Sequence, residues 1–187
     1  PSNIILDVGP GSEGISAYYN KQKFILLDIN QYSFEKIREG GVLADGNHLP
    51  FKNNAFKTVS CLDTLEHIPK KDRPKIVSEL KRVTREKLVL STVLESKDGE
   101  FQGKTYDEKF LEAFQSRFGF KEENTWEHIK NGHPTKDEIT NYFPNTKIIG
   151  YQNVENWLKY MTMQYRFPFG LLTGLYYYLF WSNEEKS

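Results

Sequence analysis

The sequence predicts an α/β protein, a Rossmann-like three-layer sandwich with a mostly parallel central sheet. Two observations lead to this prediction. Short apolar runs of strand length alternate with stretches of helical character through the first half of the chain, which is typical of parallel strands joined by helical crossovers. The first run, Asn3-Ile4-Ile5-Leu6, leads into the spacing Gly9-x-Gly11-x-x-Gly14, a glycine-rich turn that lets the backbone lie close against a ligand.

The next elements each bring an aspartate to the end of an expected strand. After the glycine turn we expect a helix over 12–20, a second strand over 23–27, a helix from about residue 33 and a short third strand over 42–44. Asp7, Asp28 and Asp45 stand where the three strands stop. Ligands of open parallel sheets collect beyond the carboxyl ends of the strands, so these acids should face one crevice.

Two further strands and a helix complete the expected sheet. The fourth strand is predicted over 56–62 and the fifth over 87–93. Between them Asp72 and Pro74 are typical of an N-cap and a first helical turn. The helix they open carries one apolar stripe made of Ile76, Val77, Leu80 and Val83.

The remainder of the chain is less regular. Residues 94–134 read as an insertion, either a lid on the substrate side or packing that covers the sheet, with one helix whose apolar register is Phe110, Leu111, Phe114 and Phe118 and whose stop is Gly119. A short helix should end near Phe143, a sixth strand should span 146–151, and residues 154–164 are helical in character. We therefore predict a Rossmann-like domain over 1–151 and an aromatic C-terminal extension over 152–187.

Composition limits the partners and the compartment. The 187 residues suit one core, and the 25 Lys and Arg balance the 25 Asp and Glu, so no global field attracts nucleic acid. The basic stretch 70–87 is either a solvated helix face or a local anion site. Cys61 is the single cysteine, which fits a structural thiol in a reducing cytosol. The chain starts at Pro1 directly on its first strand, so we expect that residues preceding it are missing.

The central motifs resemble those of class I S-adenosylmethionine-dependent methyltransferases of the small-molecule type. Besides the glycine turn and Asp28, they are Asp45-Gly-Asn-His-Leu-Pro-Phe51, Phe56-Lys57-Thr-Val59 and Leu65-Glu66-His67. Lys57 departs from the family pattern, which has aspartate there. The resemblance is strong over residues 3–93 and faint beyond them.

The resemblance implies S-adenosylmethionine as cofactor, bound by Asp7, Gly9, Pro10, Gly11, Asp28, Ile29, Asp45, Gly46 and Leu62. The glycine turn would pass beneath the methionine moiety, whose amino group Asp7 would engage. Asp28 would accept hydrogen bonds from both ribose hydroxyls, and Ile29 would pack on the adenine. Asp45 would accept the exocyclic amine of the adenine while the Gly46 amide faces a ring nitrogen, and the Leu62 carbonyl would lie near the methionine. The alternative for Asp28 and Asp45 is an ordinary turn role at the end of a strand.

A general base is needed only for an acceptor that must lose a proton. His67, just past the fourth strand, is the first candidate and Glu66 the second. A structural histidine at the start of a helix is the alternative. His48, His128 and His133 have no ligand-like spacing, so we predict no catalytic metal.

We expect methyl transfer to a small-molecule or lipid-like acceptor. An NAD(P)-dependent Rossmann oxidoreductase and a non-catalytic scaffold that binds S-adenosylmethionine are the alternatives. The almost uncharged run 167–181 is too short to span a bilayer as a straight helix, and it favours packing on the domain, a homodimer contact or attachment to a membrane surface. The expected localisation is cytoplasmic, with peripheral membrane contact as an option.

Overall fold

The structure is a computed structural model that describes residues 4–11, 14–19, 21–34, 40–150 and 153–166, with side chains described to residue 163. The chain divides into two compact units, residues 1–93 and residues 94–187. Each unit has its own secondary structure and its own buried side chains.

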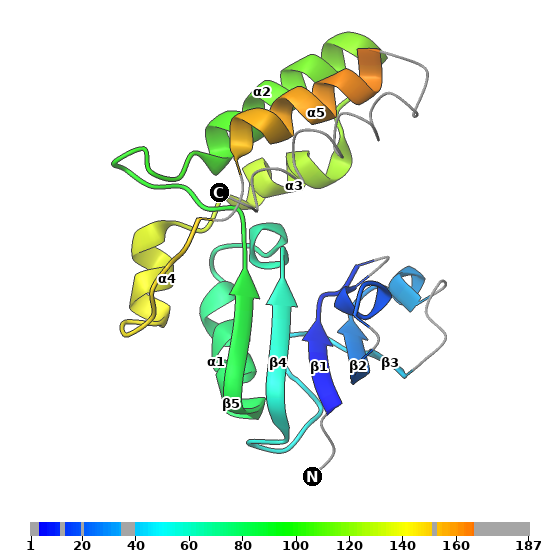
Figure 1. Cartoon of the computed structure of the whole chain (residues 1–187), viewed down its shortest axis with the longest axis vertical. Helices are drawn as coiled ribbons and strands as arrows, with labels where there is room; N and C mark the ends of the chain where they lie inside the picture. The colour runs from blue at the N-terminus through cyan, green and yellow to red at the C-terminus, as the bar shows by residue number, and fades with distance from the viewer. Residues whose placement is uncertain (1–3, 12–13, 20, 35–39, 151–152, 167–187) are drawn as a thin grey trace. The chain divides into compact units, whose positions relative to one another are not determined.

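The first unit is built on a five-stranded sheet with the order β3-β2-β1-β4-β5, in which every neighbouring pair is parallel. Its strands are β1 (Ile4–Val8), β2 (Lys23–Asp28), β3 (Gly41–Leu43), β4 (Phe56–Leu62) and β5 (Thr84–Ser91). In Figure 1 the arrowheads of β1, β2, β4 and β5 point the same way, so their carboxyl ends share one edge. The predicted α/β class with a parallel sheet is confirmed.

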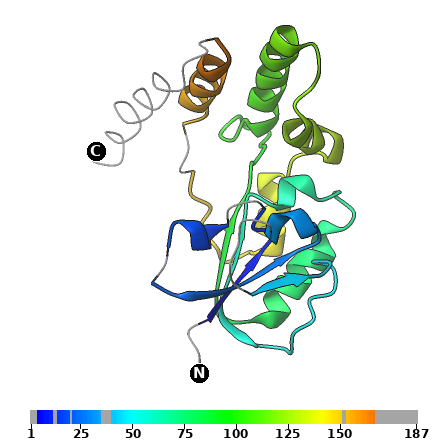
Figure 2. The ribbon, with the colours of Figure 1, turned by 90° about the vertical axis from the view of Figure 1, so that its right-hand side faces the viewer.

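Helix α1 (Arg73–Val83) packs on one face of this sheet, as Figure 2 shows. Its predicted apolar stripe, Ile76, Val77, Leu80 and Val83, is buried. Pro74 stands in the first turn as predicted, where its missing N–H costs no helical hydrogen bond. Asp72 is the N-cap residue, but its side chain makes no capping hydrogen bond, so that part of the prediction is wrong.

The described connections contain short 3-10 helices. The described part of 12–20 forms η1 (Ile15–Ala17) in place of the predicted longer helix. Residues 31–34 form η2 (Gln31–Phe34), and residues 35–39, over which the helix predicted from about residue 33 would continue, lie outside the described residues. A third 3-10 turn, η3 (Leu65–His67), directly follows β4. Strand β5 begins at Thr84, earlier than predicted, because Thr84 is already extended where α1 ends.

The second unit is helical in its described part. It contains α2 (Gly103–Phe118), α3 (Glu123–Asn131), α4 (Lys136–Tyr142) and α5 (Val154–Arg166). Gly119 ends α2 in the left-handed conformation at φ 80°, as predicted. Helices α2 and α5 pack together through aromatic rings, with the centroids of Phe110 and Trp157 at 5.5 Å.

One expectation for the C-terminal half needs correction. No strand forms over the described residues 146–150, so the sixth strand is wrong there, and residue 151 lies outside the described residues. The expected insertion 94–134 falls in the second compact unit. The run 167–181 also lies outside the described residues. Within the described part of the chain, no helix has the length and apolar character needed to cross a membrane.

Candidate functional site

The sheet order places a crossover switch between β1 and β4. From β1 the chain adds β2 and β3 on one side, and β4 and β5 lie on the other side. At such a point the two connections lead away from each other, which leaves room for a ligand beyond the carboxyl ends of the strands. Asp7 of β1 pairs in register with Ser60 of β4, so the glycine turn after β1 lies beside the segment that follows β4.

The glycine turn has the conformation that its sequence predicts. Gly9, Gly11 and Gly14 have φ values of 71°, 60° and 55°, a region that side chains with a Cβ rarely adopt. The Gly9 amide donates to the Leu27 carbonyl at 2.8 Å, and the Gly14 amide donates to the Pro10 carbonyl at 2.9 Å. A Cβ built on Gly11 would meet no atom within 4 Å, so that side of the turn is open to approach.

Thr64, a residue that the sequence analysis did not single out, packs against this turn. Its hydroxyl donates to the Leu62 carbonyl at 2.9 Å and lies 3.3 Å from the Gly9 carbonyl. The Leu62 carbonyl, expected near the methionine moiety, is therefore already an acceptor within the protein. No spacing rule pointed to Thr64, because its role depends on the adjacency of β1 and β4.

Asp7 is held inside the protein. The side chain is 2% exposed, Oδ1 accepts from the Ser60 hydroxyl at 2.7 Å, and Oδ2 accepts from the Ile15 amide at 3.1 Å. Burial raises the pKa of this carboxyl above its ordinary value, and the two hydrogen bonds oppose that shift. Asp7 thus connects β1, β4 and the end of the glycine turn.

Asp28 lies at the edge of the glycine turn, as the convergence argument requires. One carboxylate oxygen accepts from the Gly11 amide at 3.2 Å and the other from the Asn30 amide at 2.8 Å. The residue is half-buried. Its neighbour Ile29 is 72% exposed, so its apolar side chain is accessible to a ligand.

Asp45 follows β3, which pairs with β2. At the ends of the two strands the Ala44 amide donates to the Asp28 carbonyl at 3.0 Å. Its exposed carboxylate accepts from the backbone amide of Asn47 at 2.8 Å and from the side-chain amide of Asn47 at 3.0 Å. This is the turn role that we weighed as the alternative. A Cβ on Gly46 would lie in ordinary contact with Ile76, at 3.7 Å, so Gly46 is backed by α1.

His67 and Glu66 stand on η3 after β4. Glu66 is 1% exposed, and its carboxylate accepts from the Thr92 hydroxyl at 2.7 Å and the Val93 amide at 3.3 Å. This binding to the end of β5 makes Glu66 a poor candidate for proton transfer. His67 is half-buried, and its backbone amide donates to the Thr64 carbonyl at 3.0 Å.

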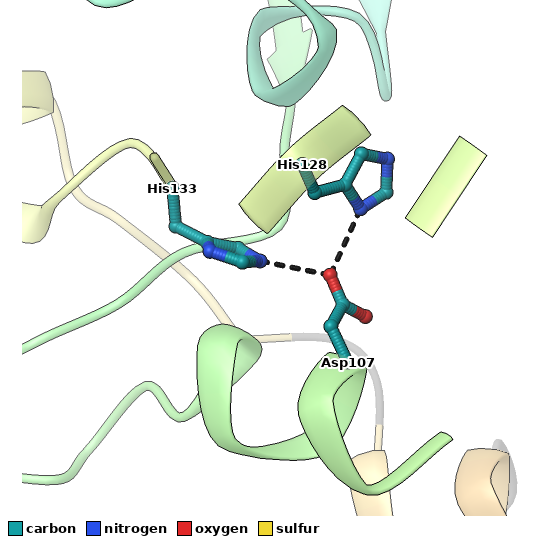
Figure 3. Close-up of side chains that lie close together, drawn as sticks. All are labelled: Asp107, His128 and His133. Carbon is teal, nitrogen blue, oxygen red and sulfur yellow. Dashed lines mark hydrogen bonds and ion pairs between the residues drawn. The ribbon is translucent and has the colours of Figure 1, made fainter. Parts of the chain in front are cut away.

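A cluster that the sequence analysis missed lies in the second unit. Asp107 of α2, His128 of α3 and His133 of the following loop meet at one carboxylate oxygen (Figure 3). Nδ1 of His128 lies 2.9 Å and Nε2 of His133 lies 2.8 Å from Oδ2 of Asp107. The spacing of the histidines did not identify this cluster, because Asp107 lies on another helix, 21 residues before His128.

Comparisons with known proteins agree with the first unit. Residues 6–90 match the family model described as a methyltransferase domain. An uncharacterized protein of Methanocaldococcus jannaschii is 32% identical over 100 residues, which cover 51% of this chain. The match covers only 42% of that relative's length.

Solved structures share the fold at low sequence identity. A protein of Bacillus halodurans, provisionally described as a methyltransferase, has a TM-score of 0.57 at 17% identity, covering 86% of this chain and 72% of its own. A SAM-dependent methyltransferase of Thermotoga maritima has a TM-score of 0.54 at 19% identity, covering 77% and 62%. One from Methanosarcina mazei has a TM-score of 0.51 at 20% identity, covering 77% and 78%.

Proposed function

Residues 6–90 belong by sequence and fold to the class I S-adenosylmethionine-dependent methyltransferases, and on this premise we propose that the protein methylates a small-molecule or lipid-like acceptor. The observation that carries the proposal is the contact between Asp28 and Gly11. It brings the acid at the end of β2 onto the glycine turn after β1, beside the crossover switch.

The residues at this edge suit an adenosyl cofactor. The carboxylate of Asp28 offers two acceptor oxygens, and a ribose offers two adjacent hydroxyl donors; charge assistance strengthens such bonds. The exposed Ile29 side chain offers an apolar surface for the adenine. The open side of Gly11 lets a ligand approach the backbone, which a Cβ would prevent.

Asp7 and Asp45 have less direct roles in this proposal. Because Asp7 is only 2% exposed, its contact with the amino group of the methionine moiety would run through a water molecule. Asp45 would turn outward from Asn47 or bind the adenine amine with its second oxygen. In the second case the hydrogen bonds to Asn47 persist, and the pre-formed turn keeps the Gly46 amide in place.

Methyl transfer on this framework is mainly a matter of positioning. The bound cofactor supplies a methyl group already activated by a sulfonium. The protein then has to hold the acceptor in line with the carbon–sulfur bond and exclude water. For an acceptor with a hydroxyl or phenol, we assign proton removal to His67, which follows β4 immediately on η3.

The proposal of a lipid-like or otherwise apolar acceptor rests on the sequence of the C-terminal run 167–181, which is rich in Tyr and Phe and almost uncharged. Liposome flotation of the full chain and of a chain ending at residue 166 tests the membrane option. The membrane option is supported if the full chain floats with the liposomes and the shortened chain does not. It is excluded if both chains are recovered with the lipid to the same extent.

Calorimetric titration with S-adenosylhomocysteine and with NAD tests the cofactor assignment. Heat with S-adenosylhomocysteine alone supports the proposal, and heat with NAD alone favours an oxidoreductase. Transfer of a radiolabelled methyl group to a panel of phenols, amines and lipid headgroups then tests activity. Binding without transfer to any member would favour a scaffold role.

A further inference from the structure

We propose that Asp107, His128 and His133 form a site for a divalent transition-metal ion, with zinc as the first candidate. Each residue offers one ligand atom, and the three atoms lie within 4.8 Å of one another. Two imidazoles with one carboxylate are a donor set that suits Zn²⁺ and Fe²⁺ better than Ca²⁺ or Mg²⁺, which prefer oxygen ligands alone.

The distances need only small adjustments to accept an ion. Zinc binds imidazole nitrogen and carboxylate oxygen at about 2.0–2.2 Å, so two ligand atoms of a tetrahedral site lie about 3.4 Å apart. The carboxylate oxygen lies 2.8 and 2.9 Å from the two ring nitrogens. For all three to surround one ion, the carboxylate oxygen would move about half an ångström away from each ring nitrogen, and the two ring nitrogens, which are at most 4.8 Å apart, would settle at a similar separation.

The backbone brings the two histidines together through Gly132. His128 lies in the last turns of α3, and Gly132, the C-cap residue, has φ 74° and ψ 130°. That conformation is essentially restricted to glycine. It redirects the chain, and His133 then faces the same oxygen as His128 from the other side (Figure 3).

The site is pre-formed and protected from water. The side chains of Asp107, His128 and His133 are 6%, 12% and 2% exposed. Within the described residues, the side chains paired with the Asp107 carboxylate are these two imidazoles. A divalent cation held by all three side chains would compensate the negative charge of the buried carboxylate.

Metal binding requires a defined change of proton position. Without metal, each imidazole donates the N–H of the bonded nitrogen to the carboxylate. With metal, the same nitrogens, Nδ1 of His128 and Nε2 of His133, present their lone pairs to the ion, and in each neutral ring the proton moves to the other nitrogen. Three protein ligands leave a fourth position for water.

Metal binding is measured on the full-length protein, freed of any affinity tag and stripped with a chelator. Zinc is titrated in competition with a chromogenic chelator, and cobalt is added separately for its visible absorption bands. We expect one tight zinc per chain, a zinc-dependent rise of the melting temperature and cobalt bands that zinc displaces. None of these measurements involves S-adenosylmethionine, so they are independent of the proposed transferase activity.

Three variants and one control assign the site. Asp107→Asn, His128→Gln and His133→Gln should each weaken zinc binding by more than about 100-fold, beyond the loss typical of outer-shell partners. His48→Gln removes an exposed histidine of the first unit and should leave the affinity unchanged. Absence of zinc and cobalt binding to the wild-type protein would overturn the proposal, and so would equal zinc affinity in all four variants. Circular dichroism checks that each variant is folded.

Discussion

Gly9 lies so close to Thr64 that a Cβ on the glycine would be 2.4 Å from Cγ2 and 2.7 Å from Oγ1 of the threonine. The two residues follow β1 and β4, the strands on either side of the crossover switch. Glycine is therefore required at position 9 for two reasons, its φ of 71° and the absence of space for a side chain.

Gly9→Ala should destabilise the first unit and abolish binding of S-adenosylhomocysteine. The backbone conformation alone costs about 1–2 kcal/mol, and the contact with Thr64 adds to it. Chemical denaturation and calorimetry measure the two effects.

Gly11→Ala is the matched control, because its φ is 60° and a Cβ there would meet nothing within 4 Å. It should lose stability through backbone strain alone. In the double variant Gly9→Ala/Thr64→Ala, the loss of stability should be smaller than the sum of the single losses. An additive result would contradict the proposed clash.

Asp28→Ala should lower the affinity for S-adenosylhomocysteine by at least about 100-fold. Each hydrogen bond to a charged acceptor is worth about 1.5–3 kcal/mol, and the ribose would lose two. Calorimetry provides the dissociation constant. Glu86→Gln, an exposed acid near the opposite edge of the sheet, should have no effect. Unchanged affinity in the Asp28 variant would contradict the ribose assignment.

The stability contributed by Asp7 should fall as the pH rises. Burial raises the pKa of this carboxyl in the folded state above 3.8, so between the unfolded and the folded pKa the native state holds more protons than the unfolded state. The free energy of unfolding therefore declines with pH over that window and is level above it. We therefore expect the difference in the free energy of unfolding between the wild type and Asp7→Asn to decline as the pH rises. Chemical denaturation of both proteins from pH 3 upward measures this difference. A difference that rises with pH would show that the hydrogen bonds from Ser60 and Ile15 outweigh burial.

The sheet was predictable because parallel strands buried on both faces leave continuous apolar runs between turn residues. The Gly9 and Gly11 turn, the apolar stripe of α1 and the stop at Gly119 follow from local rules of the same kind. These features depend on neighbouring residues in the chain, and a single sequence displays them directly.

Contacts between distant segments were not predictable in this way. The bond from Ser60 to Asp7 and the packing of Thr64 on Gly9 require β1 and β4 to be neighbours, which residue spacing alone does not indicate. His128 and His133 became partners only through Asp107 on another helix. The apolar residues around Ile149 indicated a strand, but strand formation also requires a pairing partner, and the described residues 146–150 have none.

Gly132→Ala should weaken zinc binding as well as stability. A Cβ finds open space there, so the effect comes from the backbone, and a cost of at least about 1–2 kcal/mol is expected at φ 74°. Relaxation of this strain would move His133 away from His128. Gly119, in the same unit, has a similar φ of 80°, so Gly119→Ala is the matched control. It should lose stability without losing zinc affinity. Equal zinc affinity in both variants would contradict the role of Gly132 in forming the site.

His67→Gln should reduce turnover of a hydroxyl or phenol acceptor by about 100-fold or more, because positioned bases contribute at least that much to proton transfer. The affinity for S-adenosylhomocysteine should stay at the wild-type value, since the proposed cofactor contacts do not include His67. His48→Gln, which replaces an exposed histidine outside the proposed site, should retain the wild-type rate. Parallel loss of turnover and cofactor affinity would instead identify His67 as a structural residue of η3.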